Sequence, residues 1–166
     1  MGTPDHLFTI GVYGWTKEEF FAALRRYDID VLCDIRYRRG VRGKTYSFVN
    51  ARALRAELEK LNIAYIHMKD LAPPPEIRQL QQQADTSSKT AKRKREEMAP
   101  EFIDGYHETI LDKVDSREVL SRLPEGMRHP AFLCVEGPPR ACHRFLVAHR
   151  IEQDCSIPVT HITQEC

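Results

Sequence analysis

Short apolar runs alternate with longer amphipathic stretches along the first 67 residues. The runs Leu7–Val12, Val31–Ile35 and Ile63–His67 are largely apolar, which is typical of strands in a buried sheet. A helix is expected to begin at Thr16, because a glutamate three residues later completes a capping box and an apolar stripe follows. Asn50 is expected to cap a second helix with leucines along one face. The order is therefore strand, helix, strand, helix, strand.

The second half of the chain continues the same alternation. Apolar runs at Ala131–Glu136 and Pro158–Ile162 predict two further strands, and helical patterns occupy residues 100–111, 115–123 and 142–153. Helical crossovers between short apolar strands favour a parallel sheet that is covered on both faces. We therefore predict one α/β domain over residues 1–166, with a mostly parallel, Rossmann-like or flavodoxin-like sheet of about five strands.

One segment, at about residues 72–97, does not fit this alternation. It begins with three consecutive prolines, Pro73 to Pro75, and is rich in Gln, Ser, Thr, Lys and Arg. We interpret it as an excursion that is partly helical and has no core of its own. The basic run within it, Lys89–Arg95, is usually a solvated helix face. It could also contact phosphate, because the excursion starts where the third strand ends.

Composition excludes several classes of protein. Hydrophobic residues make up 42% and charged residues 30% of the 166 residues, as in globular rather than disordered chains. Lys and Arg number 25 against 24 Asp and Glu, so the net charge of +1 argues against a protein coated in positive charge. No apolar run could span a bilayer and no secretory signal is visible, so we expect a cytoplasmic protein without membrane partners. Its five scattered cysteines are expected to be reduced thiols.

The parallel strands also predict where a ligand binds. In open sheets of this kind, ligands lie outside the carboxyl ends of the strands, so residues after the first, second and fourth predicted strands should share one cleft. After the first strand, Gly11 and Gly14 allow close backbone approach, and the next helix start offers N–H groups to an anion. Tyr13 is the candidate functional side chain there, although this turn can equally be purely structural.

The segment after the second predicted strand is strongly basic and contains no acidic residue between Arg36 and Lys44. Arginine binds phosphate in a bidentate way, and the nearby Tyr37, Tyr46 and Phe48 could stack on bases. The alternative is a solvated, mobile loop, in which Asp34 forms an internal ion pair that only shapes the backbone. We favour phosphate contact, and the candidate groups are Arg36, Arg38, Arg39, Arg42 and Lys44.

The segment after the fourth predicted strand holds the densest cluster of reactive groups. Glu136 is a candidate general base, or a nucleophile toward a glycoside. Cys142 opens a helix beside His143, which would favour a nucleophilic thiolate. Zinc could be bound by Cys134, Cys142 and His143, but the paired ligand spacing typical of zinc sites is absent, and free cysteines are more often small buried hydrophobes. We therefore assign no metal ligand and expect no cofactor. Two further arginines, Arg140 and Arg144, are candidate phosphate contacts.

These motifs resemble one family. The segments that carry the resemblance are Thr9–Gly11, Asp34–Arg36, Tyr65–His67, Cys134–Glu136 and Cys142–Arg144. In this order, from about Phe8 to Ile162, they are similar to the bacterial and archaeal family called domain of unknown function 488. The Cys-x-Glu and Cys-His-Arg motifs are the most specific part of this resemblance. The basic segment from Arg36 to Lys44, which we call the arginine loop, resembles one branch of the family. Val12 and Tyr13 depart from the family's first turn, where His or Tyr precedes Ser.

The resemblance implies the fold and the location of the site and leaves the reaction open. Our leading hypothesis is an enzyme acting on a nucleotide or nucleic acid, and hydrolysis of an N-glycosidic bond is the reaction that we favour. Asp34 and Glu136 would supply two carboxylates, Tyr13 a phenol, and the arginines would hold phosphate. The alternatives are a binding module without catalysis, in which the carboxylates only orient arginines, and thiol chemistry at Cys142. The oligomeric state is not predictable from these patterns.

Overall fold

The computed structural model describes residues 3–164 and contains one five-stranded sheet. All of its strand pairs are parallel, in the order β3-β2-β4-β1-β5, which confirms the predicted α/β class. Each strand lies within or beside a predicted apolar run. The strands are β1 (Leu7–Ile10), β2 (Val31–Asp34), β3 (Ala64–His67), β4 (Pro130–Leu133) and β5 (Val159–Ile162).

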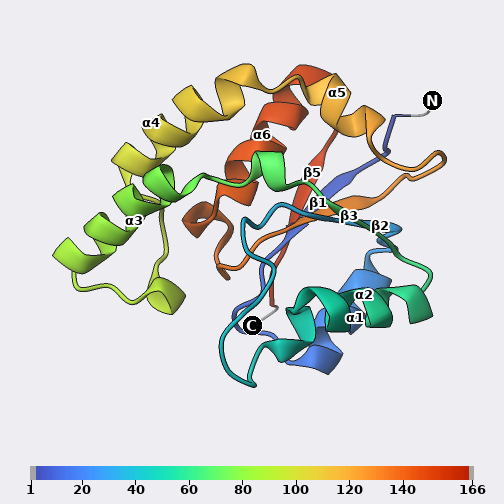
Figure 1. Cartoon of the computed structure of the whole chain (residues 1–166). Coiled ribbons are helices and arrows are strands. Elements are labelled where there is room, and N and C mark those ends of the chain that lie inside the picture. The colour runs from blue at the N-terminus through green and yellow to red at the C-terminus, as the bar shows by residue number, and fades with distance from the viewer. Residues whose placement is uncertain (1–2, 165–166) are drawn as a thin grey trace.

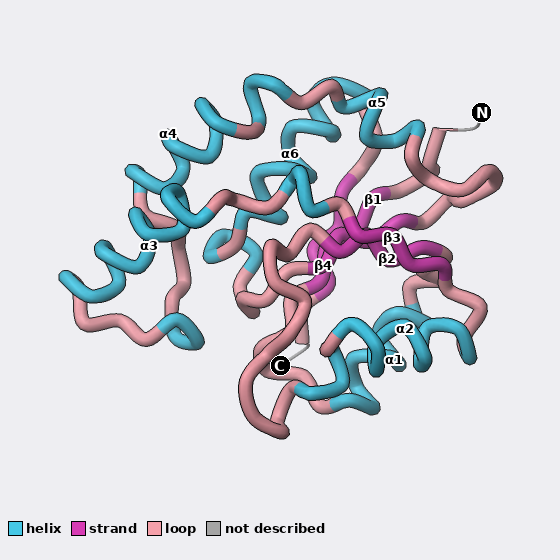
Figure 2. Tube along the Cα trace, in the orientation of Figure 1, coloured by secondary structure: helices cyan, strands magenta, loops and turns pink. Residues whose placement is uncertain are grey.

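Helices cover both faces of the sheet, as the alternation predicted (Figure 1). Two helices lie on one face, and the others lie on the opposite face, as the tube representation also shows (Figure 2). The first group comprises α1 (Lys17–Arg26) and α2 (Ala51–Lys60). The second comprises α3 (Pro75–Ser87), α4 (Pro100–Thr109), α5 (Ser116–Ser121) and α6 (His143–Cys155).

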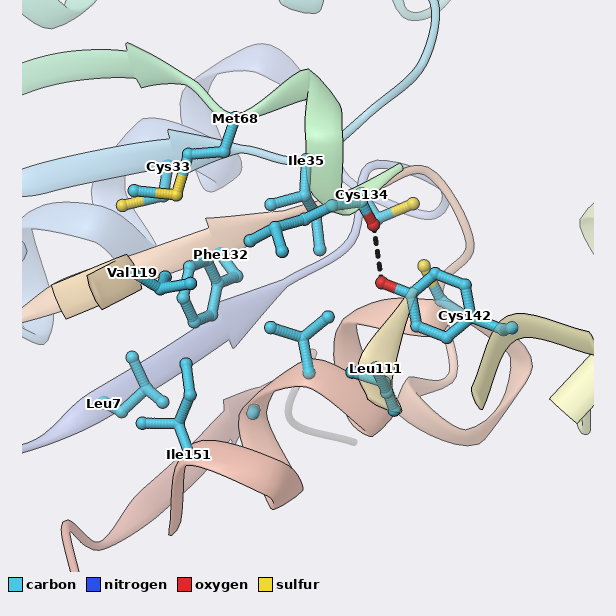
Figure 3. Packing of buried hydrophobic residues seen from close by; sticks show 14 of the residues in the cluster. Leu7, Cys33, Ile35, Met68, Leu111, Val119, Phe132, Cys134, Cys142 and Ile151 are labelled. Atoms are coloured by element: carbon cyan, nitrogen blue, oxygen red, sulfur yellow. Dashed lines mark hydrogen bonds between the residues drawn. The ribbon is translucent and has the colours of Figure 1, made fainter. Parts of the chain in front are cut away.

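The strands divide their side chains between two hydrophobic cores. Along β1, Leu7 packs into the core beneath α4–α6, whereas Phe8 and Ile10 pack into the core beneath α1 and α2. Because successive side chains of a strand point to opposite faces, an almost continuous apolar run can fill both cores. Figure 3 shows part of the first core, with Cys134 and Cys142 at one edge of it. This double burial explains why the strands lack a polar face.

The strand order sets the location of the site. β4 lies between β2 and β1, which differs from the usual Rossmann order 3-2-1-4-5 and flavodoxin order 2-1-3-4-5. The segment that follows β4 therefore leaves the sheet between the ends of β1 and β2. This confirms that the segments after the first, second and fourth predicted strands meet at one edge.

The two predicted helix caps differ in outcome. Thr16 forms the expected capping box with Glu19, in which each side chain accepts from the other residue's backbone N–H at 3.2 Å. Asn50 does occupy the N-cap position of α2, but its side chain makes no capping hydrogen bond there. Its Oδ1 accepts instead from the Val41 N–H at 2.7 Å, and the Ala51 N–H at the start of the helix donates to the Arg39 carbonyl at 3.1 Å. The arginine loop thus contributes to the cap of α2.

The excursion at 72–97 folds against the main domain. It contains α3 and a 3-10 turn at Lys92–Lys94, which confirms partly helical structure. Ile77 and Met98 are buried in the core that α4–α6 cover, in agreement with the expectation that the excursion has no core of its own. Within the described residues, no helix is long and apolar enough to cross a membrane. Cys166 lies outside the described residues.

Candidate functional site

A cavity of about 640 Å³ lies at the carboxyl edge of the sheet, a size typical of small-ligand sites. Its walls come from the turn after β1, the arginine loop, the excursion and the segment that joins β4 to α6. Six basic side chains and two carboxylates are among the described residues that line it. These are Arg36, Arg38, Arg42, Arg78, Lys92 and Arg95, with Asp85 and Glu136. The cavity is therefore basic although the whole chain is almost neutral.

The arginine loop, residues 36–44, is anchored near its middle, and the arginines on either side of the anchor are exposed. Hydrogen bonds from Val41 to Asn50 and from Ala51 to Arg39 fix its backbone against α2. Arg38 and Arg42 are exposed, line the cavity and form no ion pair with a carboxylate of the described residues. Two free guanidinium groups on a fixed backbone are well suited to bind an anion from solution.

Asp34 and Arg36 form a buried ion pair beneath this loop. The Arg36 Nε and Nη2 atoms donate to the two oxygens of Asp34 at 2.8 and 2.7 Å, and Nη2 also donates to the Val49 carbonyl at 2.8 Å. The Tyr65 hydroxyl donates to Asp34 at 2.6 Å. Asp34 is fully buried and does not line the cavity, whereas Arg36 does. The geometry corresponds to the ion-pair alternative that the sequence left open.

The turn after β1 brings the backbone rather than a charged group to the site. A Cβ atom at Gly11 would lie 1.9 Å from the Glu136 carbonyl oxygen, so only glycine fits at this position. Gly14 has a φ of +97° and donates its N–H to the Tyr46 hydroxyl at 3.0 Å. Tyr13 lines the cavity with its ring 5.2 Å from that of Tyr46. At the helix start that was expected to offer N–H groups to an anion, the capping box engages those of Thr16 and Glu19.

Arg144 holds the turn after β4 in place. Its Nη1 donates to the Glu136 carbonyl at 2.6 Å, its Nη2 to the Gly137 carbonyl at 2.8 Å, and its Nε to Thr9 Oγ1 at 3.3 Å. All three nitrogens of this fully buried guanidinium are therefore occupied by the protein. His143, the neighbouring residue on α6, lines the cavity instead. The two differ because adjacent side chains of a helix point in different directions.

Two thiols and an imidazole lie together at the base of the cavity. The Nδ1 atom of His143 is 3.4 Å from Cys134 Sγ and 3.8 Å from Cys142 Sγ. Burial alone would oppose ionisation of Cys142, but the Cys134 thiol, His143 and Arg144 hold the pKa of Cys142 below its usual range. Burial raises the pKa of Cys134 well above its usual range. Of the two thiols, that of Cys142 is thus the preferred site of negative charge.

Glu136 is held by a cation that the sequence did not assign to it. Arg95, in the excursion, donates through Nη2 to Glu136 Oε1 at 2.6 Å and through Nη1 to Asp85 Oδ2 at 2.6 Å. Burial raises the pKa of Glu136, and the negative charge at Cys142 adds to this shift, while Lys92 and Arg95 oppose it. A buried carboxyl group with a raised pKa is suited to general acid chemistry.

The structure brings together some of the predicted site residues and leaves others outside the cavity. Tyr13, Arg36, Arg38, Arg42, Glu136, Cys142 and His143 line it. The candidates outside it are Gly11, Gly14, Asp34, Arg39, Lys44, Arg140 and Arg144. Asp85 and Arg78 were missed, because nothing distinguishes them from other polar residues of a surface helix. Arg95 had a signal, since it ends the basic run that we considered as a phosphate contact.

One comparison with known proteins gives a match. The model of the family described as Domain of unknown function DUF488 matches residues 16–151, and the chain belongs to this family. The match includes the Cys-x-Glu and Cys-His-Arg motifs and the arginine loop, and it begins after the turn that follows β1. No curated protein and no solved structure matches the chain.

Proposed function

We propose that this DUF488 protein is an enzyme that acts on a nucleotide or a nucleic acid held by phosphate contacts in the basic cavity. The single observation that carries the proposal is the charge of this cavity, in which six basic side chains face two carboxylates that Arg95 already bridges. Of the lining cations that form no ion pair with a carboxylate of the described residues, Arg38 and Arg42 are exposed, whereas Arg78 is half-buried and packs on the Tyr37 ring. A polyanion or a single nucleotide is the class of ligand that such a cavity attracts.

A buried donor without an acceptor supports the same proposal. Arg36 lines the cavity, and no hydrogen-bond acceptor of the described residues reaches its Nη1 atom, although the side chain is only 1% exposed. A buried guanidinium nitrogen without a partner is costly. A phosphate or carbonyl oxygen of a ligand in the cavity would satisfy this donor.

For the reaction, we propose hydrolysis of an N-glycosidic bond with Glu136 as the general acid. Glu136 is 7% exposed, lines the cavity and has a raised pKa, so it could protonate a departing base. Asp34 does not take part in this scheme, since its carboxylate is engaged by Arg36 and Tyr65. Asp85 is the second carboxylate of the cavity, and Tyr13 is a polar side chain that could contact the sugar or base.

Equilibrium binding with mononucleotides, single strands and duplexes at two salt concentrations tests the ligand. We expect binding that weakens with salt, and the double variant Arg38→Ala/Arg42→Ala should bind at least about tenfold more weakly, the equivalent of one lost charge-assisted hydrogen bond. The control is Arg52→Ala/Arg117→Ala, which removes the same charge from exposed positions of α2 and α5. Equal affinity of the two double variants, or no binding by the wild-type chain, would overturn the proposal.

Release of free base from the bound ligand, measured by chromatography, tests the reaction. Glu136→Gln should retain ligand affinity, because glutamine can still accept from Arg95, and should lower turnover by about 10²–10⁴. Binding by the wild-type chain without any release of base would contradict the enzymatic half of the proposal. It would favour the alternative of a phosphate-binding module without catalysis.

A further inference from the structure

The two thiols and the imidazole at the base of the cavity have the spacing of a metal-binding site. Their three ligand atoms all lie within 4.8 Å of one another, and Nδ1 of His143 is 3.4 and 3.8 Å from the sulfurs of Cys134 and Cys142. In a tetrahedral zinc site, the bond lengths imply a separation of about 3.5 Å between sulfur and nitrogen ligands. The cluster thus matches these edges of a coordination tetrahedron with little adjustment.

The orientation of His143 supports the same reading. Its Nε2–H donates to the Ile35 carbonyl at 2.9 Å, which leaves the lone pair of Nδ1 directed toward the two sulfurs. Histidines that bind metals commonly donate their other ring N–H to a carbonyl or carboxylate, which fixes the ring and its tautomer. Tyr106 packs against the same ring, with the centroids 5.5 Å apart. The imidazole is therefore preorganised by Ile35, which directly follows β2, and by Tyr106 of α4.

The local fold brings the three ligands together although they are separated in sequence. Cys134 directly follows β4, and a 3-10 turn at Pro139–Ala141 returns the chain so that Cys142 is the N-cap of α6 and His143 its first residue. All three residues line the cavity. Figure 3 shows both sulfurs at the same edge of the core. This turn brings the three ligands together in space. The site therefore does not need the short paired spacing of ligands in the sequence, whose absence led us to assign no metal ligand from the sequence.

We propose that Cys134, Cys142 and His143 bind one thiophilic divalent cation, zinc foremost, at the base of the cavity. Two thiolates and an imidazole favour zinc over magnesium or calcium, which require oxygen ligands. Three protein ligands leave the fourth position for a water molecule or a substrate atom, as in catalytic rather than structural zinc sites. This inference goes beyond the proposed function and does not depend on which ligand the cavity holds.

Glu136 gives the fourth position a chemical role. Its Oε2 lies 3.7 Å from Cys134 Sγ, while its Oε1 is held by Arg95 at 2.6 Å. The Oε2 atom is therefore beside the ligand cluster, and Glu136 itself lines the cavity. A zinc ion lowers the pKa of a bound water, and a carboxylate at this position could take the proton that the water releases. Glu136 would then serve as acid or base next to the metal rather than as a permanent ligand.

Cobalt titration of the reduced, untagged chain tests the proposal. We expect one equivalent of Co²⁺ to bind and to produce thiolate-to-cobalt charge-transfer absorption with an intensity typical of two thiolates. One equivalent of Zn²⁺ should abolish that absorption and raise the midpoint temperature of unfolding. Absence of charge-transfer absorption from the wild-type chain would overturn the proposal, whatever the variants do.

Matched cysteine variants locate the site. Cys134→Ser and Cys142→Ser should each halve the charge-transfer intensity and weaken metal binding by at least about tenfold to 100-fold, the range seen even for groups that only support ligands. Cys33→Ala and Cys155→Ala are the controls, because these free cysteines lie outside the cluster. Full absorption in Cys134→Ser/Cys142→Ser would contradict the assignment. Nucleotide binding through Arg38 and Arg42 is scored separately, so failure here is distinguishable from failure of the proposed function.

Discussion

At the scale of single residues, Asp34 and Arg36 show how one sequence motif can have a structural rather than a chemical role. Asp34 is fully buried, and its two oxygens accept from Arg36 and Tyr65. Burial, together with the charge of Asp34, raises the pKa of Tyr65 to about 12, so the phenol stays a donor at physiological pH. The carboxylate thus orients Arg36, which in turn donates to the Val49 carbonyl in the 3-10 turn just before α2.

Replacement of Asp34 by asparagine should therefore affect stability first. We expect Asp34→Asn to lower the free energy of unfolding by about 3–5 kcal/mol, because it leaves the buried Arg36 guanidinium without its counter-charge. Chemical denaturation measures this, and Asp104→Asn at an exposed position of α4 is the control. A loss below about 1 kcal/mol accompanied by loss of turnover would instead indicate that Asp34 acts in the reaction.

The residues after β4 were the most predictable part of the site. Side chains two residues apart in an extended segment point to the same side, and those of Cys134 and Glu136 do meet, with Sγ 3.7 Å from Oε2. The contacts of the arginine side chains were less predictable, because a long side chain that ends in a guanidinium group can reach either the cavity or a nearby carbonyl. Arg144 reaches the carbonyls of Glu136 and Gly137. Only the three-dimensional position of those carbonyls decides between the two.

At the scale of elements, the excursion becomes a wall of the cavity and Arg95 fastens it. The Arg95 guanidinium bridges Asp85 of α3 and Glu136 after β4, and the Met98 N–H donates to the Arg140 carbonyl at 3.0 Å. The sequence indicated a partly helical excursion but not its docking, because α3 carries mostly polar residues and its few buried contacts are long-range. The position in which the excursion docks therefore depends on residues far away in the chain.

Removal of the Arg95 charge should loosen this wall. In Arg95→Gln, we expect hydrogen exchange of the amides in residues 88–98 to rise about tenfold to 100-fold, since two charge-assisted hydrogen bonds that hold the segment are lost. Exchange in α6 should remain unchanged. Lys94→Gln is the control, because it removes a charge from an exposed position in the same turn. Equal exchange in both variants would mean that Arg95 does not fasten the segment.

At the scale of the whole molecule, the class of fold was predictable and the order of strands was not. Local periodicity indicates strands and helices, and their alternation implies a parallel sheet. The position of β4 between β2 and β1 depends on where the long connection through α3–α5 returns to the sheet. That choice rests on packing between distant segments. The near-zero net charge was equally uninformative, because it hides a basic cavity whose charge is balanced by acidic residues elsewhere in the chain.

The edge strand β5 joins the sheet partly through a histidine that must stay neutral. His161 pairs with Thr9 across β1 and β5, and its Nδ1 lies 2.6 Å from Thr9 Oγ1. Because the Arg144 Nε–H donates to the same hydroxyl oxygen, we assign the hydroxyl hydrogen to the bond with Nδ1. Burial lowers the pKa of His161, as do Arg144 and His149, while Glu152 opposes them. Protonation would therefore weaken the attachment of β5.

The contribution of His161 to the stability should fall as the pH drops below about 6.5, the usual pKa of histidine. Above that pH, His161 is neutral in both states and contributes no difference. Below it, the unfolded chain binds a proton more readily than the folded one, so the free energy of unfolding decreases until the pH reaches the lowered pKa. Chemical denaturation at pH 7.5 and 5.5 should show a smaller decrease for His161→Gln than for the wild-type chain. His107→Gln on α4 is the control, and an equal pH dependence of all three chains would show that β5 is not held by a neutral His161.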